Sequence, residues 1–379
     1  MASAPPPRLT GLDLFRGLAV AGMIIVNTPG SGHYVWWPLD HAAWNGFTPT
    51  DLVFPAFLFA VGVALALSFP RRIDAVLWRR VARRTASLIA LGWAWQMLAR
   101  PCLATFRLMG VLPRIGLCYG IVAVFVMLTA RRDADGRARL DAGLIGGAAV
   151  AILASYAALM LLVPVPGHGA GQLTPDGNLA GYVDRMLLTS AHMWRFGTGA
   201  SGAVVYDPEG LLSTLPALAN VLFGMLAAIA WQRAPARAVA WIAIGGVVLV
   251  GAGLLLDPLF PINKRLWSSS YALFSSGLSA LLLALAMLAS RRPALNRLFA
   301  PLYLLGMNAI LGYILSLLLG LAGMRLYIGT TTLGAHAFAA MQAVAPDPYL
   351  ASFLCSLAVL ALVIGPLVPL HRRGIHLRL

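Results

Sequence analysis

The sequence predicts an all-α polytopic membrane protein, a bundle of about ten transmembrane helices with both termini on the cytoplasmic side. Hydrophobic residues make up 60% of the 379 residues and charged residues only 11%, whereas a soluble domain carries about 25% charged residues. Several apolar runs reach the ~20 residues that span the hydrocarbon core of a bilayer. The basic residues are grouped in every second segment between these runs. Lipid, rather than water, is therefore expected to surround most of the chain.

Ten apolar stretches are predicted to be transmembrane helices. They are residues 12–30, 51–70, 84–100, 110–130, 141–163, 211–231, 238–256, 271–290, 299–320 and 350–370. The first stretch is not read as a cleaved signal peptide, because it contains Asp13 and Arg16 and no small-residue cleavage site follows it. No internal repeat is evident. Residues 1–379 are therefore expected to form a single transmembrane domain.

The arginine clusters determine the predicted orientation. They comprise Arg71, Arg72, Arg79, Arg80, Arg83 and Arg84; Arg131, Arg132, Arg137 and Arg139; Arg233 and Arg237; Arg291, Arg292 and Arg297; and Arg372, Arg373 and Arg378. Cytoplasmic loops carry an excess of basic residues, so an N-terminus inside places every cluster on the cytoplasmic face. The segments then expected outside are 31–50, 101–109, 164–210, 257–270 and 321–349. This distribution explains the net charge of +15 without nucleic acid as a partner.

The predicted outer segments differ in character from the inner ones, because they hold mixed polar and titratable groups rather than arginine alone. The longest, 164–210, begins with a Pro/Gly-rich piece and continues into an apolar-patterned stretch, 178–196. This stretch is suited to form a short helix on the outer surface. Long loops of this kind are usually functional or disordered. The chemistry is therefore expected to face outward.

One segment, residues 39–59, combines a titratable residue with the start of a predicted helix, and its sequence is LDHAAWNGFTPTDLVFPAFLF. His41 is suited to act as a general base, because the unperturbed pKa of histidine lies near ~6.5. The alternative is an interfacial histidine that is hydrogen-bonded beside neighbouring aromatic residues. The residues alone leave both interpretations open.

Asp51 and Asn27 also have two interpretations each. Thr48, Pro49 and Asp51 match the N-cap, first-turn and third positions of a helix start. The Asp51 carboxylate is equally placed to orient His41 or to bind an ammonium group. Asn27 precedes Thr-Pro-Gly, a helix stop signal. Its amide is also suited to stabilise an oxygen on which negative charge develops.

Other candidates lie in the later segments. Lys264, Trp267 and Ser269 place a cation, an aromatic ring and a hydroxyl before a helix, a pattern that suits an anionic group or a sugar. Interfacial anchoring is the alternative for the first two. Glu209 belongs to Asp-Pro-Glu-Gly, which otherwise predicts a capped helix start. Asn308 lies within the ninth predicted helix, where it either joins helices or lines a pocket.

Sequence blocks spread over most of the chain resemble blocks of one known family and follow one another in the same order. They are LTGLDLFRGLAVAGMIIVN, DHAAWNGFTPTDLVFPAFLF, GVLPRIGLCYG, NLAGYVDRMLL, YDPEGLLSTLPALANVLFGML, PINKRLWSSSYALFSSGL and PLYLLGMNAILGYILS. This set resembles heparan-alpha-glucosaminide N-acetyltransferase and its bacterial relatives. The stretch between Asn27 and His41 is slightly longer than in the animal enzyme, whose N-terminal luminal portion has no counterpart in this sequence. We therefore leave the acceptor sugar open.

The resemblance implies a transmembrane acetyltransferase that takes acetyl-CoA from the cytosol and acetylates an amino sugar on the far side. It assigns the family's histidine to His41 and the asparagine that ends the first helix to Asn27. His41 is then the expected general base, with a transient acetyl-imidazole as the competing covalent route. Asn27 is the expected donor to the thioester oxygen, and Asp51 completes the expected catalytic group.

The expected binding residues follow from the same blocks. Those for the sugar are Trp44, Asn45, Glu209, Lys264, Trp267, Ser269 and Asn308. Arg16 and Arg114 are expected to meet CoA, because the guanidinium group suits phosphates. An ion pair with Asp13 is the alternative for Arg16, and Arg114 is predicted to point into the bundle. No metal is expected, and Cys102, Cys118 and Cys355 lack metal-ligand spacing.

The expected location is a bacterial inner membrane, with the active site facing the periplasm. The expected partners are the amino-sugar acceptor, acetyl-CoA and membrane lipid, and a homodimer is left open. O-acylation of a glycan hydroxyl is the nearest alternative activity. An amino-sugar permease is the alternative from another class, but transporter sites lie near the bilayer midplane, whereas the polar groups here gather in the outer segments.

Overall fold

The computed structural model describes residues 9–70, 72–133 and 137–373, so that Arg71 and Arg378 of the predicted arginine clusters lie outside the described residues. Within these ranges the regular secondary structure is helical apart from isolated bridges and two short antiparallel hairpins. The hairpins pair β1 (Arg131–Arg132) with β2 (Ala138–Arg139), and β3 (Tyr327–Ile328) with β4 (Thr331–Thr332). The all-α fold class predicted from composition is confirmed.

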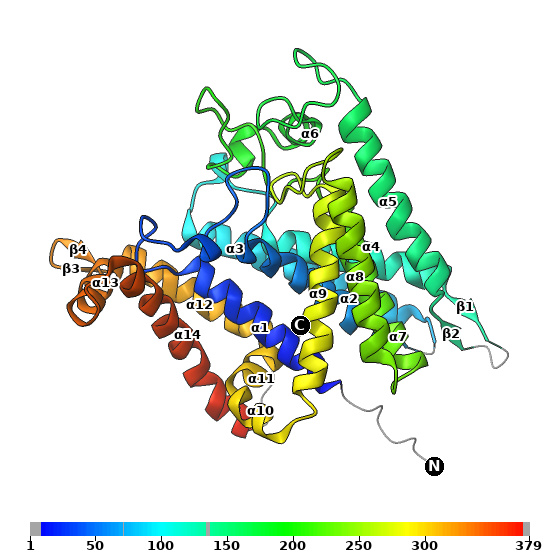
Figure 1. Cartoon of the computed structure of the whole chain (residues 1–379). Coiled ribbons are helices and arrows are strands. Elements are labelled where there is room, and N and C mark those ends of the chain that lie inside the picture. The colour runs from blue at the N-terminus through cyan, green and yellow to red at the C-terminus, as the bar shows by residue number, and fades with distance from the viewer. Residues whose placement is uncertain (1–8, 71, 134–136, 374–379) are drawn as a thin grey trace. The chain divides into compact units, whose positions relative to one another are not determined.

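The helices follow one another as Figure 1 shows. They are α1 (Thr10–Asn27), α2 (Val53–Leu67), α3 (Ala75–Ala99), α4 (Val111–Thr129), α5 (Ala142–Leu162), α6 (Leu179–Leu188), α7 (Thr214–Arg233), α8 (Ala238–Leu256), α9 (Ser269–Ala289), α10 (Pro293–Leu298), α11 (Ala300–Met307), α12 (Ala309–Arg325), α13 (Leu333–Val344) and α14 (Pro348–Arg372). Short 3₁₀ turns are η1 (Trp37–Leu39), η2 (Pro49–Leu52), η3 (Leu103–Thr105) and η4 (Ser190–His192). All ten predicted apolar stretches are helical over most of their length.

Eight helices in the described part of the chain are long and apolar enough to cross a membrane. They are α1, η2 with α2, α4, α5, α7, α8, α9 and α14. The pair α11 and α12 passes the same test together but is bent by 94° at Asn308, which divides the predicted stretch 299–320 in two. The protein is an integral membrane protein.

The third predicted stretch, 84–100, corresponds to α3, which begins nine residues earlier than expected. Asp74 caps this helix, because its carboxylate accepts a hydrogen bond of 2.8 Å from the N–H of Leu77. The first half of α3 therefore includes the arginines from Arg79 to Arg84. Their charge explains why α3 is not among the eight apolar helices.

The chain divides into two compact units. Unit 1 contains the described residues within 1–41, 48–53 and 281–378, and unit 2 contains those within 42–47 and 54–280. The prediction of a single domain over residues 1–379 stays a prediction. Helices α2 and α9 each begin in one unit and continue into the other.

Unit 1 is built around α1, which packs against α11, α12 and α14. Two glycines allow α1 and α11 to touch through their backbones. A Cβ on Gly17 would overlap the carbonyl of Leu302, and one on Gly306 would overlap the carbonyl of Asp13. Small residues permit such close approach where lipid gives helices no hydrophobic reason to associate.

Unit 2 uses the same device at the contact between α2 and α7. A Cβ on Gly62 would overlap the carbonyl of Val221, and one on Gly224 would overlap the carbonyl of Phe59. In the same unit α4 packs against α3 and α7, and α7 also packs against α5 and α8. The interior of unit 2 is therefore centred on α7.

The predicted outer segment 164–210 carries the helix α6, which lies beside the C-terminal end of α5 (Figure 1). Asn178 caps α6 by accepting a hydrogen bond of 2.7 Å from the N–H of Gly181. Its apolar face joins Leu179 and Ala180 to a buried cluster with Tyr156 and Phe260. The short helix expected within 178–196 is confirmed, and its packing holds this loop against the helices of unit 2.

Candidate active site

The loop that carries His41 is held in unit 1 by threonine side chains. The hydroxyl of Thr50 donates to the carbonyl of Pro38 at 3.0 Å, and that of Thr48 donates to the carbonyl of Asp40 at 2.6 Å. Both threonines are buried. These bonds fix the chain on either side of His41, so that an otherwise irregular segment presents its histidine in one position.

Asp51 connects the helix start to His41. One carboxylate oxygen, Oδ2, accepts hydrogen bonds from the backbone N–H of Thr48 at 3.0 Å and from its hydroxyl at 3.1 Å. The other, Oδ1, lies 2.7 Å from Nδ1 of His41. The geometry therefore supports both interpretations of Asp51. Its carboxylate caps η2 and is also the hydrogen-bond partner of the His41 imidazole.

The two members of this pair differ in exposure. The Asp51 side chain is 1% exposed, whereas that of His41 is 38% exposed. A carboxylate that accepts from Nδ1–H selects the tautomer in which Nε2 carries the lone pair. The arrangement therefore places a nitrogen base at the surface and a fixed anion behind it.

The remaining predicted residues of unit 1 lie on its helices. Asn27 is the last residue of α1 and is exposed. Arg16 lies in the same helix and is half-buried. Asn308 is 1% exposed at the break between α11 and α12, and its Oδ1 has no hydrogen-bond partner. The catalytic roles of Asn27 and His41 and the binding roles of Arg16 and Asn308 stay predictions.

In unit 2, Trp44 and Asn45 are anchored to later parts of the chain. The indole N–H of Trp44 donates to the carbonyl of Leu173 at 2.9 Å, and its ring meets Tyr206 edge-on at 5.0 Å between centroids. The amide oxygen of Asn45 accepts from Asn263 at 3.0 Å. Trp44 is half-buried and Asn45 exposed, so both retain surface for a ligand.

Glu209 belongs to a buried ionic group with Arg107 and Asp207. The guanidinium of Arg107 donates to Asp207 at 2.9 and 2.5 Å and to Glu209 at 2.5 Å. Burial is the largest influence on the pKa of Glu209 and would raise it, but the cations Arg107, Arg114 and Lys264 together outweigh burial, and the net shift is downward. Burial opposes the charge on Arg107, yet the two carboxylates raise its pKa. Arg107 and Glu209 are therefore both charged.

The helix-start interpretation of Asp-Pro-Glu-Gly is wrong. Residues 207–210 form a turn in which the N–H of Gly210 donates to the carbonyl of Asp207 at 3.0 Å, and α7 begins at Thr214. The Asp207 carboxylate accepts from Arg107, from the backbone N–H of Trp194 and, within this turn, from the backbone N–H of Glu209. The carboxylate therefore both holds this turn and pairs with a distant cation, but it caps no helix.

Arg114 lies wholly buried in α4, as its position in an apolar run predicts. Its guanidinium donates to the carbonyl of Gly210 at 2.8 Å and to the hydroxyl of Ser213 at 2.5 Å. It also lies 4.9 Å from the ring centre of Trp267, itself wholly buried. The indole N–H of Trp267 donates to Asn220 at 2.9 Å. Binding of CoA by Arg114, and of sugar by Trp267, stay predictions.

Two other predicted sugar contacts, Lys264 and Ser269, lie on either side of Trp267 in the sequence. The hydroxyl of Ser269 is buried and donates to the carbonyl of Leu153 at 2.8 Å. Lys264 lies in the turn before Trp267. The φ of Trp267 is 52°. A left-handed backbone in a bulky residue is unusual, and it turns the indole towards Asn220. Their binding roles remain predictions.

Asp184 of α6 is a buried carboxyl that the sequence did not single out as functional. Its Oδ1 accepts from the N–H of Leu211 at 2.8 Å, while Oδ2 is buried and has no hydrogen-bond partner. Burial raises the pKa of Asp184 to about 7, although the N–H of Leu211 opposes this shift. This carboxyl is therefore partly protonated near neutral pH.

Three residues of this network were missed: Arg107, Asn220 and Asp184. Arg107 and Asn220 had a signal in the sequence, because each is a polar residue in an otherwise apolar stretch, whereas Asp184 stands beside Arg185. The partners were not readable, since Arg107 and Asp207 are 100 residues apart. Among the described residues no group of three or more His, Cys, Asp or Glu side chains is arranged to hold a metal ion.

Comparison with known proteins supports the family resemblance of the sequence blocks that carry these residues. The family model described as heparan-alpha-glucosaminide N-acetyltransferase, catalytic, matches residues 8–158. The Homo sapiens protein named heparan-alpha-glucosaminide N-acetyltransferase is 32% identical over 359 residues, which covers 82% of this chain and 53% of the human protein. The Mus musculus protein of the same name is 30% identical over 310 residues, or 70% of this chain and 46% of the mouse protein.

The chain belongs to the heparan-alpha-glucosaminide N-acetyltransferase family. It spans about half the length of the curated relatives it matches. The stretch matched by the family's catalytic model includes Asn27, His41 and Asp51, and it also includes Arg107 and Arg114. The hydrogen-bonded histidine therefore lies within the part of the chain that carries the family's signature.

Proposed function

We propose that this family member transfers acetyl from acetyl-CoA to the amino group of a glucosamine-type sugar. The observation that carries the proposal is the 2.7 Å contact between Nδ1 of His41 and the buried carboxylate of Asp51. The names of the relatives, which are N-acetyltransferases, support the same reaction class. Acetyl-CoA is a co-substrate in this proposal rather than a resident cofactor.

The reaction needs a base at the moment of attack. The amine nitrogen attacks the thioester carbonyl, the C–N bond forms, and the C–S bond breaks to release CoA as its thiolate. Nε2 of His41 accepts the proton that the nitrogen loses and passes it to the departing sulfur, so that protons balance. Asp51 stabilises the imidazolium between these two transfers. General-base assistance of this kind is worth about 10²–10⁴-fold in rate.

Asn27 supplies the second element of the proposal. The thioester oxygen gains negative charge as the nitrogen attacks, and an amide N–H is a suitable donor to it. One such donor contributes roughly 3–4 kcal/mol in acyl-transfer enzymes. Asn27 is exposed at the end of α1 in the same unit as His41 and Asp51, and no rearrangement of α1 is needed to uncover its amide.

We place the acceptor on the periplasmic side of a bacterial inner membrane. The basis is the alternation of arginine clusters with the polar segments 31–50, 101–109 and 164–210. The acetyl group then crosses the membrane while CoA stays on the cytoplasmic side. Arg16, near the N-terminal end of α1, is a candidate contact for the CoA phosphates.

The test is acetyl transfer by the purified protein in lipid vesicles. Labelled acetyl-CoA is supplied on one side and glucosamine on the other, and the product is analysed for amide or ester. We expect amide product from wild type and a loss of about 10²-fold or more in kcat from His41→Ala and from Asp51→Asn. Matched controls are His33→Ala, an exposed histidine in the same unit, and Asp40→Asn, a neighbouring carboxylate.

Folding of each variant is checked by its thermal unfolding, because Asp51 also caps η2. An asparagine retains an oxygen that accepts from Thr48, so Asp51→Asn is expected to unfold close to wild type. Full activity in folded His41→Ala would contradict the proposal. Ester product would instead identify an O-acyltransferase, and sugar uptake without acetylation would identify a permease.

A further inference from the structure

The beginning of α3 carries arginines that have no acidic partner. Asp74 is the only acidic residue between Asp51 and Asp133, and its Oδ1 accepts from the N–H of Leu77 at the start of the helix. In the part of the chain that the structure describes, four exposed arginines here have neither an ion pair nor a side-chain hydrogen bond. These four residues, the α3 arginine patch, are Arg72, Arg79, Arg80 and Arg83.

The arginines of the hairpin β1–β2, in the same unit, are compensated. Arg131 lies 2.5 Å from a carboxylate oxygen of Asp141, and Arg139 lies 3.1 Å from one of Asp133. Both arginine side chains are nevertheless largely exposed, at 80% and 74%. Exposure alone therefore does not leave an arginine of this unit without a counter-charge. The α3 arginine patch differs from the hairpin because the surrounding sequence offers it no carboxylate.

The patch lies on the side of α3 that faces away from α4. The buried residues of α3 are Val81, Leu88 and Gly92, and this helix packs against α4. Arg79 and Arg83 stand two residues before and after Val81, which at about 100° per residue places both on the opposite side of the helix. Helical side chains lean towards the N-terminus, so the guanidinium groups gather at the beginning of α3. Like charges one turn apart repel one another there.

The same side of α3 continues as an apolar stripe. Ala86, Ala90 and Ala94 follow the patch at helical spacing and are exposed, and residues 85–99 carry no charge. Trp78, beside the patch, is 38% exposed, and tryptophan is enriched at the membrane–water interface. Cations at the start of the helix, followed by an uncharged stripe of small side chains, match the headgroup and the acyl chains of a lipid.

We propose that the α3 arginine patch binds the phosphate group of an anionic phospholipid, in the leaflet that faces the cytoplasm in the predicted orientation. Guanidinium groups bind phosphate through paired N–H donors, and basic clusters beside a membrane-embedded segment attract acidic lipids. The bound phosphate relieves the repulsion among the arginines. A soluble phosphate compound would be attracted by the same charges, but it would leave the apolar stripe and Trp78 without a partner. The inference is independent of the acetyl transfer proposed above.

The experiment measures the binding of a fluorescent phosphatidylglycerol to the purified full chain in a non-ionic detergent, by fluorescence anisotropy. Phosphatidylcholine with the same fluorophore has a phosphate but no net charge, and it controls for partitioning into the micelle. Wild type is expected to bind the phosphatidylglycerol probe more tightly, and added NaCl should weaken this binding. Arg79→Gln with Arg83→Gln is expected to weaken it about thirtyfold, because each basic residue near a membrane surface contributes about a factor of five.

The matched control is Arg131→Gln with Arg139→Gln. This variant also removes two exposed arginines, but these already have carboxylate partners, so it is expected to retain most of the wild-type affinity. Thermal unfolding without lipid checks that each double variant is folded. Should the first double variant fail to fold, Arg72→Gln with Arg80→Gln takes its place in the comparison.

Three outcomes would overturn the inference. Equal losses of affinity in the patch variant and the hairpin variant would show that binding follows net charge alone. Equal binding of the two probes to wild type would show that the lipid's charge is not recognised. Displacement of the phosphatidylglycerol probe by coenzyme A at a lower concentration than by unlabelled phosphatidylglycerol would assign the patch to a soluble phosphate compound instead of a lipid.

Discussion

At the residue scale, the proposed chemistry depends on the carboxylate of Asp51, whose two oxygens have different hydrogen-bond partners. Asp51 gives Oδ2 to the backbone and hydroxyl of Thr48 and Oδ1 to His41. A buried carboxylate with fixed hydrogen bonds is a rigid acceptor, so the imidazole is oriented without a cost in entropy when substrate arrives. The exposed side of the imidazole is available to substrate, whereas its Nδ1 is held by Asp51.

Asp184, unlike Asp51, is a buried carboxyl whose ionised form is stabilised by few hydrogen bonds. Burial raises its pKa to about 7, whereas the pKa of an unfolded aspartate is near 3.9. The folded state therefore binds more protons than the unfolded state between these values. Stability is then greatest at low pH, falls as pH rises from about 4 to 7, and levels off above the folded pKa.

We expect the free energy of unfolding to fall by up to about 1.4 kcal/mol per pH unit between pH 5 and 6 through Asp184. Asp184→Asn removes this group, so its unfolding midpoint should depend less on pH. Thermal unfolding in detergent at pH 5, 6, 7 and 8 measures the effect, with Asp176→Asn as the control in the same loop. An identical pH dependence in wild type and Asp184→Asn would rule out the assignment.

At the scale of elements, glycines decide which helices meet. The contact between α2 and α7 places Gly62 on the carbonyl of Val221 and Gly224 on that of Phe59. A helix pair joined at such a distance gains dispersion contacts along both backbones, which is the main source of association in lipid. Asn308 separates two helices instead of joining them, because the chain bends by 94° at this residue between α11 and α12.

Gly62→Ala is expected to destabilise the protein by about 1–3 kcal/mol, since its methyl group must displace the backbone of α7. Gly245→Ala in α8 is the matched control, because nothing lies within 4 Å of the position of its Cβ. The control should be neutral or slightly stabilising. Unfolding midpoints of the two variants in the same detergent provide the comparison. Equal midpoints would show that α2 and α7 do not meet at Gly62.

At the scale of the whole molecule, the proposed reaction requires the polar segments to face away from the arginine clusters. Cys102 is a natural reporter of this arrangement, because it is exposed in the segment 101–109 while Cys118 and Cys355 are buried. A hydrogen bond with Thr105 lowers the pKa of the Cys102 thiol. The thiolate fraction is increased, which favours reaction with a maleimide.

A membrane-impermeant maleimide is expected to label Cys102 in right-side-out vesicles and not in sealed inside-out ones. The control is Ala236→Cys in a Cys102→Ala background, which places the thiol between α7 and α8 beside Arg233 and Arg237. That variant should show the reverse pattern. Labelling of Cys102 from the cytoplasmic side would invert the predicted topology and the proposed direction of acetyl transfer.

The sequence alone was sufficient for the fold class, the positions of the apolar helices and the cap formed by Thr48 and Asp51. These depend on local physics: transfer of apolar side chains into lipid, the number of residues that cross it, and hydrogen bonds between residues three apart. The family blocks added His41 and Asn27. Local signals also misled, as at Asp207, whose carboxylate serves Arg107 rather than a helix end.

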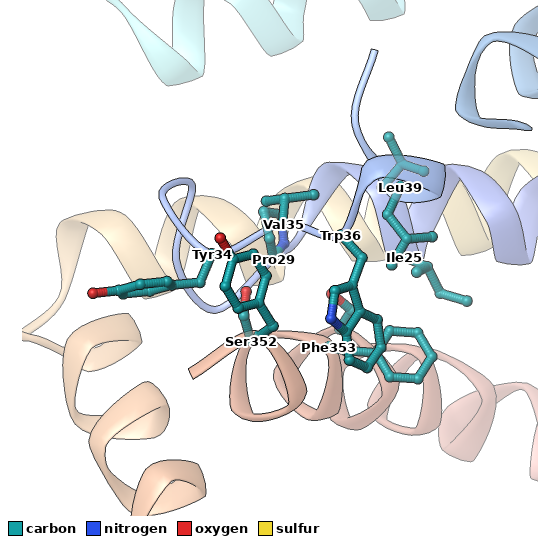
Figure 2. A pocket seen from close by; sticks show the side chains of 11 residues that line it. Ile25, Pro29, Tyr34, Val35, Trp36, Leu39, Ser352 and Phe353 are labelled. Atoms are coloured by element: carbon teal, nitrogen blue, oxygen red, sulfur yellow. The ribbon is translucent and has the colours of Figure 1, made fainter. Parts of the chain in front are cut away.

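Only the tertiary structure decided which polar residues are partners. The burial of Trp267 against Arg114 and the group formed by Arg107, Asp207 and Glu209 depend on packing between distant segments. Figure 2 shows that side chains from the end of α1 and the first turns of α14 likewise line one small pocket, although they stand more than 300 positions apart. A buried charge must find a partner somewhere in the fold, but its position in the chain carries no record of which one.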